Sequence, residues 1–134
     1  MGISNAEHQE YGRPSEHYVI VPVSCPVPDR AAGAPKLSGR LRVRLRPGSR
    51  LQAIYGRNTI EEEYFCNYEL NRSWQERLET AGLRISAWDE EGAARAVELE
   101  GHPFFFATQF LPQDRAGAGE THPFVLAFVK AAVR

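Results

Sequence analysis

The sequence has few of the residues that hold small secreted or metal-bound domains together. Among 134 residues there are two cysteines, Cys25 and Cys66, and neither belongs to a CxxC pair or to a Cys/His cluster with ligand spacing. A disulfide framework and a structural zinc site are therefore not expected. We expect no metal and no cofactor, and the scarcity of cysteine favours a reducing, cytoplasmic location.

Long apolar runs are also missing. The N-terminal stretch MGISNAEHQEYGRPSEHY has no apolar core of a signal peptide, and no segment approaches the roughly 18 apolar residues that a membrane span needs. A phosphate-binding loop of the GxxxxGK[ST] type is absent too. These absences predict no membrane partner and no nucleotide-driven synthetase activity for this chain. What is present, 43% hydrophobic and 25% charged residues, is typical of one globular domain.

Charge is partitioned sharply although the net charge is only −1. Residues 30–60 hold eight basic and no acidic side chains, whereas residues 61–100 hold eleven acidic and four basic ones. We expect the two blocks to face each other and neutralise. In residues 40–46 arginine alternates with Leu41, Val43 and Leu45, which predicts a strand with an apolar face and an arginine face. An anion site on that arginine face is the alternative, but nucleic acid is not expected as a partner because the pI is near 6.4.

The remaining pattern predicts a mixed α/β fold of short strands with two helices. Residues 1–17 are expected to form a polar, loosely held arm, and residues 26–39 a loop rich in proline and glycine. Strands are predicted at 18–23, 40–46, 51–55, 61–70, 83–88, 95–99 and 104–110, the last one buried on both faces. One helix begins at Asn71 or Ser73 and ends at Gly82, and a second begins near residues 121–123.

Six short strings carry a resemblance to a known family. They are Tyr68-Glu69-Leu70-Asn71, Ala81-Gly82-Leu83-Arg84, His102-Pro103-Phe104, Gln109-Phe110-x-Pro112, His122-Pro123-Phe124 and Phe128-Val129-Lys130-Ala131-Ala132. In order and spacing they resemble RYEVN, AGLR, HPWF, QFHPE, GHPLF and GFVKAA of the class I glutamine amidotransferase domain of the CTP synthase family. The resemblance runs from about residue 40 to the end and is poor over residues 1–39. It implies that residues 18–134 form the C-terminal half of one amidotransferase-like domain.

The resemblance also implies which catalytic groups have been lost. The family uses a cysteine on a sharp strand-to-helix turn, a histidine base and a glutamate that orients the histidine. Leu111 and Gln113 stand where the family has that histidine and glutamate, and neither cysteine has the small neighbours of such a turn. Asn67 and Tyr68 match the family's glutamine-binding run, but Asn67 replaces its arginine. The chain is therefore expected to be a non-catalytic accessory or relic module linked to glutamine-dependent CTP synthesis.

Several alternatives stay open. A changed chemistry could use Cys66 with Glu62, with His102 or His122 nearby, although acidic neighbours do not favour a thiolate. Both histidines precede a proline and are otherwise expected to serve as turn or capping residues. The chain could also be the tail of a longer protein, with the missing half-domain on a partner polypeptide. An exposed edge beside the three phenylalanines then predicts either that partner or a homo-oligomer.

Overall fold

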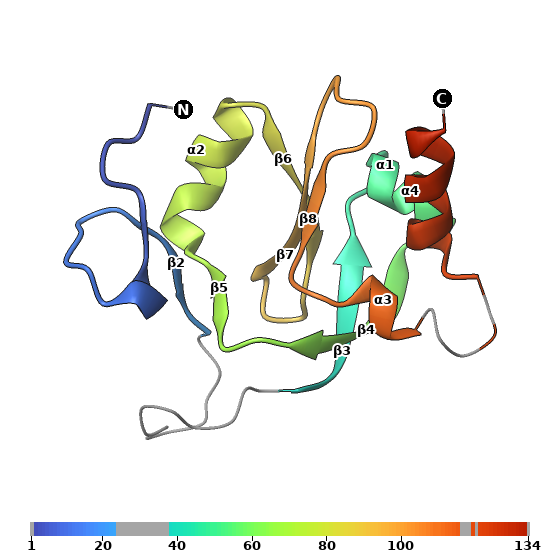
Figure 1. Cartoon of the computed structure of the whole chain (residues 1–134), viewed down its shortest axis with the longest axis horizontal. Coiled ribbons are helices and arrows are strands. Elements are labelled where there is room, and N and C mark those ends of the chain that lie inside the picture. Colours follow the sequence, from blue (N-terminus) through green and yellow to red (C-terminus); the bar gives the residue numbers. More distant parts are fainter. Residues whose placement is uncertain (1, 24–37, 116–118, 120, 134) are drawn as a thin grey trace.

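The computed structural model describes residues 2–23, 38–115, 119 and 121–133. They form two sheets (Figure 1). The smaller sheet has the order β1-β2-β5, from strands Glu7–His8, Tyr18–Pro22 and Tyr68–Leu70. The larger has the order β4-β3-β6-β7-β8, from strands Thr59–Phe65, Ser38–Leu45, Leu83–Trp88, Ala94–Leu99 and Phe106–Thr108. The loop expected at 26–39 and Cys25 lie almost wholly outside the described residues.

Helices cover both sides of the β6–β7 hairpin. Helix α2 (Gln75–Thr80), preceded by the 3-10 turn η2 (Arg72–Trp74), lies on the side of the smaller sheet. Helices α1 (Arg50–Tyr55) and α4 (Pro123–Ala132) lie together on the other side, above the short α3 (Pro112–Arg115) (Figure 1). Two buried clusters follow this division, one of Val43, Leu45, Leu51, Ile60, Ala87, Ala96 and Phe110, the other of Leu70, Trp74, Leu78, Ile85 and Ala94. None of the described helices is long and apolar enough to cross a membrane.

The arginine strand pairs with the acidic strand, as the charge pattern predicts. Strand β3 runs antiparallel to β4 and places Arg40 opposite Glu63 and Arg42 opposite Glu61. Arg40 Nε lies 3.2 Å from Glu63 Oε1, and Arg42 pairs with Glu90 of the β6–β7 turn. Val43 and Leu45 are buried on the opposite face. The arginine face is therefore largely neutralised by acids of this same chain, which weakens the alternative of an anion site there.

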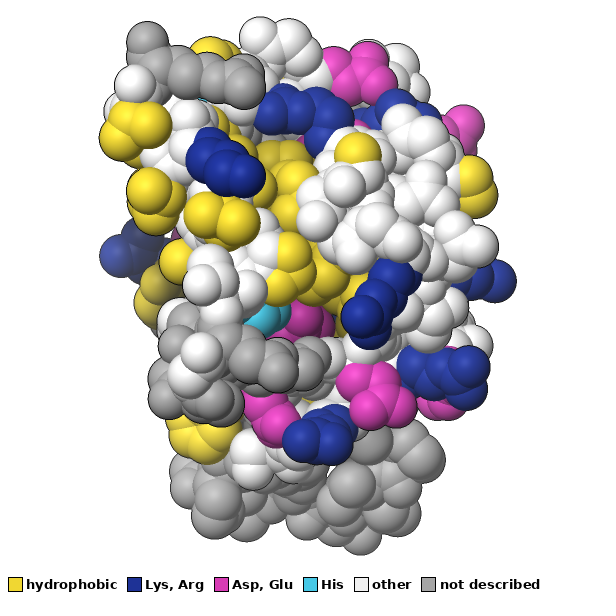
Figure 2. Space-filling model, turned by 90° about the vertical axis from the view of Figure 1, so that its right-hand side faces the viewer, with side chains coloured by type: hydrophobic (Ala, Val, Ile, Leu, Met, Phe, Trp, Pro, Cys, Tyr) yellow, Lys and Arg dark blue, Asp and Glu magenta, His cyan; other side chains and the backbone are white. Residues whose placement is uncertain are grey.

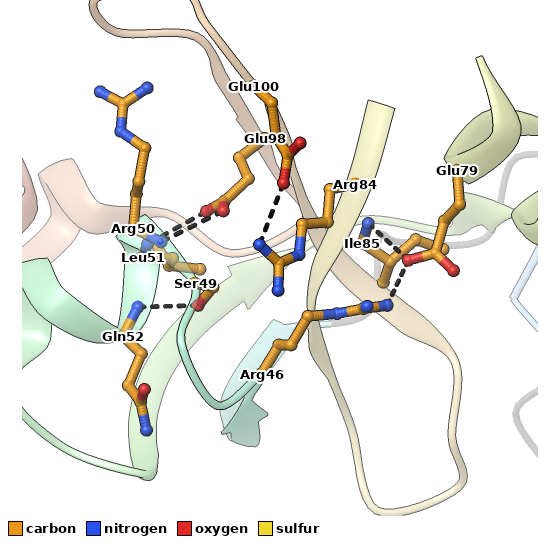
Figure 3. Close-up of polar contacts among 10 residues, drawn as sticks. All are labelled: Arg46, Ser49, Arg50, Leu51, Gln52, Glu79, Arg84, Ile85, Glu98 and Glu100. Atoms are coloured by element: carbon orange, nitrogen blue, oxygen red, sulfur yellow. Dashed lines mark hydrogen bonds and ion pairs between the residues drawn. The ribbon is translucent and has the colours of Figure 1, made fainter. Parts of the chain in front are cut away.

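Residues 51–55 were expected to extend and instead form α1. Ser49 begins this helix, because its hydroxyl accepts a hydrogen bond from the Gln52 backbone at 3.0 Å. The buried carboxylate of Glu98, from β7, accepts hydrogen bonds from the two preceding backbone N–H groups, those of Arg50 and Leu51, each at 3.1 Å (Figure 3). Six residues are too few for a helical period to appear in sequence, and the second cap comes from a residue 47 positions away.

Two further predicted strands are corrected. Residues 61–70 form two strands in different sheets, β4 paired with β3 and β5 with β2, with the break at Cys66 and Asn67. Of residues 104–110 only Phe106–Thr108 is a strand, and it is an edge strand with Ala107 exposed, not one buried on both faces. Just after the strand ends, the Thr108 hydroxyl donates to the Phe110 carbonyl at 2.9 Å.

The N-terminal arm and the helix starts also differ in detail. The arm is not loosely held, because β1 pairs with β2, the turn η1 (Gln9–Tyr11) follows it, and His17 meets the Trp74 ring edge-on. Asn71 caps η2 by accepting from the Ser73 backbone at 3.1 Å, so Asn71 rather than Ser73 begins the helical segment. The C-terminal helix lies where the sequence predicts it, with Pro123 in its first turn.

Candidate functional site

A pocket of about 220 Å³ surrounds Cys66, the free thiol among the described residues. Tyr64 and Tyr68 lie on either side of Cys66 along the chain and line the pocket with it. The Tyr68 backbone donates to Cys66 Sγ at 3.4 Å. Asn67, the other residue matched to the family's glutamine-binding run, is absent from this lining, and its carbonyl accepts from the Val23 backbone at 2.9 Å. Of the two residues matched to the family's glutamine-binding run, Tyr68 lines this pocket and Asn67 does not.

Three charged groups tie the two sheets together at this pocket. Arg95 on β7 donates to Asp89 Oδ2 at 2.7 Å and to Glu69 Oε2 at 3.0 Å. Both carboxylate side chains are 3% exposed and the Arg95 side chain is 14% exposed. Glu69 belongs to β5 of the smaller sheet and Arg95 to the larger sheet. No local pattern in the sequence indicates this cluster, because Glu69 and Arg95 are 26 residues apart.

Glu62 lies with His122, not with Cys66. His122 Nε2 is 3.0 Å from Glu62 Oε1, and the two side chains are 4% and 1% exposed. Both line a smaller hollow with Tyr55 and Arg57, and that hollow shares no residue with the pocket around Cys66. The proposed combination of Cys66 and Glu62 is therefore not assembled in this structure. His122 is the N-cap residue of α4, which agrees with its expected place at the start of an element, but its side chain makes no capping hydrogen bond and pairs with Glu62.

His102 is where the sequence predicts, in an exposed turn. Its Nδ1 accepts a hydrogen bond from the Phe104 backbone at 3.1 Å, and its ring meets Phe105 edge-on. It lines neither the Cys66 pocket nor the hollow at Glu62. Among the described ranges no three His, Cys, Asp or Glu side chains are grouped to hold a metal ion.

Leu111 and Gln113 stand at the junction between β8 and α3. The Leu111 backbone donates to the Glu63 carbonyl of β4 at 2.8 Å, and the Asp114 backbone donates to the Leu111 carbonyl at 3.1 Å. These two bonds fix the main chain at position 111 beside β4. Leu111 is half-buried and Gln113 is exposed on α3. Position 111 thus has a defined place in the fold but offers only an aliphatic side chain.

Comparison with known proteins gives a consistent result. No protein-family model matches the chain. It is 32% identical over 134 residues to the CTP synthase of Symbiobacterium thermophilum, an alignment that covers 99% of this chain and 25% of that protein. It is 36% identical over 141 residues to the CTP synthase of Aeropyrum pernix, covering 100% of this chain and again 25% of the relative.

The fold is similar to that of a solved structure, the glutaminase domain of Trypanosoma brucei CTPS with bound acivicin. The TM-score is 0.86 at 30% identity, and the match covers 98% of this chain and 52% of that chain. The chain therefore spans about a quarter of the length of the relatives it matches and about half of this domain. The alignments cover 99% and 100% of this chain, so they extend into residues 1–39, where the sequence strings that carry the resemblance are missing.

Proposed function

Because the chain belongs to the CTP synthase family, in which it corresponds to the C-terminal glutamine amidotransferase region, we propose that it is an amidotransferase-like module that does not hydrolyse glutamine. The observation that carries the proposal is Leu111 at the position of the family's histidine base. A cysteine nucleophile needs a neighbouring group that takes its proton, and leucine has no lone pair with which to do so.

The position of the family's orienting glutamate is changed as well. The residue two positions after Leu111, Gln113, is a neutral amide in place of that glutamate. The buried Glu62–His122 pair is the nearest arrangement to a carboxylate-oriented histidine in the described chain, but it belongs to the hollow beside Tyr55, which Leu111 does not line. The catalytic pair has no counterpart at this position.

Glutamine recognition is weakened by charge as well. Asn67 replaces the arginine that grips the substrate carboxylate in the family, and an amide supplies no positive charge. The two glutamates Glu62 and Glu63 precede it on β4, where the family run is rich in basic residues. Glu62 is buried against His122 and Glu63 pairs with Arg40, so neither position offers the positive charge that would hold an α-carboxylate. The role that remains is that of a non-catalytic accessory module in the cytoplasm, linked to glutamine-dependent CTP synthesis.

The test measures hydrolysis and binding separately. The purified chain is incubated with glutamine and ammonia is followed against a buffer blank, with a family glutaminase as the positive control. We expect no ammonia above the blank and no heat of glutamine binding in calorimetry. Ammonia release that disappears in the Cys66→Ala or Glu62→Gln variant would overturn the proposal, because it would show that other residues have taken over the chemistry.

A further inference from the structure

We draw no further inference here: the strongest candidate, the apolar surface patch where α4 lies beside the edge strand β8 (Figure 2), belongs to a chain that covers 52% of the solved domain it resembles, and nothing in the described residues shows what covers it.

Discussion

Glu62 and His122 form a buried pair that joins the acidic strand β4 to the first turn of α4. The carboxylate oxygen lies 3.0 Å from the imidazole Nε2, across 60 residues of sequence. The Tyr55 ring of α1 meets the His122 ring edge-on at 5.7 Å, so the pair also helps to hold α1 against α4. Both residues are candidates for the changed chemistry considered from the sequence, but their burial against each other favours a structural role.

Removing the carboxylate should therefore weaken the fold. We expect Glu62→Ala to lower the free energy of unfolding by about 2 to 3 kcal/mol, because a buried imidazole loses its hydrogen-bond partner. Urea unfolding followed by circular dichroism measures the change. Glu76→Ala, at an exposed position of α2, is the control and should stay within about 0.5 kcal/mol of the parent. A loss for Glu62→Ala no larger than that of the control would show that the pair does not hold α4.

Removing the charge of Arg95, which pairs with Asp89 and Glu69, should also lower the free energy of unfolding. Arg95→Met keeps the length of the side chain but leaves the carboxylates of Asp89 and Glu69 buried without their cation, which is expected to cost about 3 to 5 kcal/mol. The variant should unfold at lower urea concentration, or fail to fold. Arg42→Ala removes a guanidinium that is 64% exposed and should change the free energy by no more than about 0.5 kcal/mol. Equal losses in the two variants would contradict the assignment of the cluster as the link between the sheets.

Restoring the family's acid and base should not restore hydrolysis. Leu111→His combined with Gln113→Glu returns a histidine and a glutamate to the positions of the family pair. We nevertheless expect no ammonia release from glutamine, because Cys66 lies in a pocket that neither residue lines and no positioned nucleophile has been identified for the new base. A coupled ammonia assay on the folded double variant measures this. Steady turnover would contradict this expectation, because it would mean that Leu111 and Gln113 alone account for the absence of glutamine hydrolysis in the parent chain.

Elements with a strong local signal could be predicted from sequence. The alternation of arginine with Leu41, Val43 and Leu45 predicted β3, and the separation of basic and acidic blocks predicted its pairing with acids. Pro123 and the apolar spacing after it predicted α4. For the C-terminal helix, the residues that decide the structure are close together in the chain. For the arginine strand, the opposite charge of residues 61–100 indicates which segment will pair with it.

The amino-acid sequence by itself determined whether these segments form strands or helices, and it carries the resemblance to the family, which implies that Leu111 replaces the base. Only the tertiary structure decided that residues 50–55 coil into α1, because the carboxylate of Glu98 reaches the start of that helix from β7. The tertiary structure also decided that Glu62 lies within hydrogen-bond distance of His122, and that Cys66 accepts a hydrogen bond from the Tyr68 backbone. It likewise placed Arg95 against the carboxylates of Asp89 and Glu69. These contacts join residues on different strands, and the periodicity of a single segment carries no information about which strand will lie beside it.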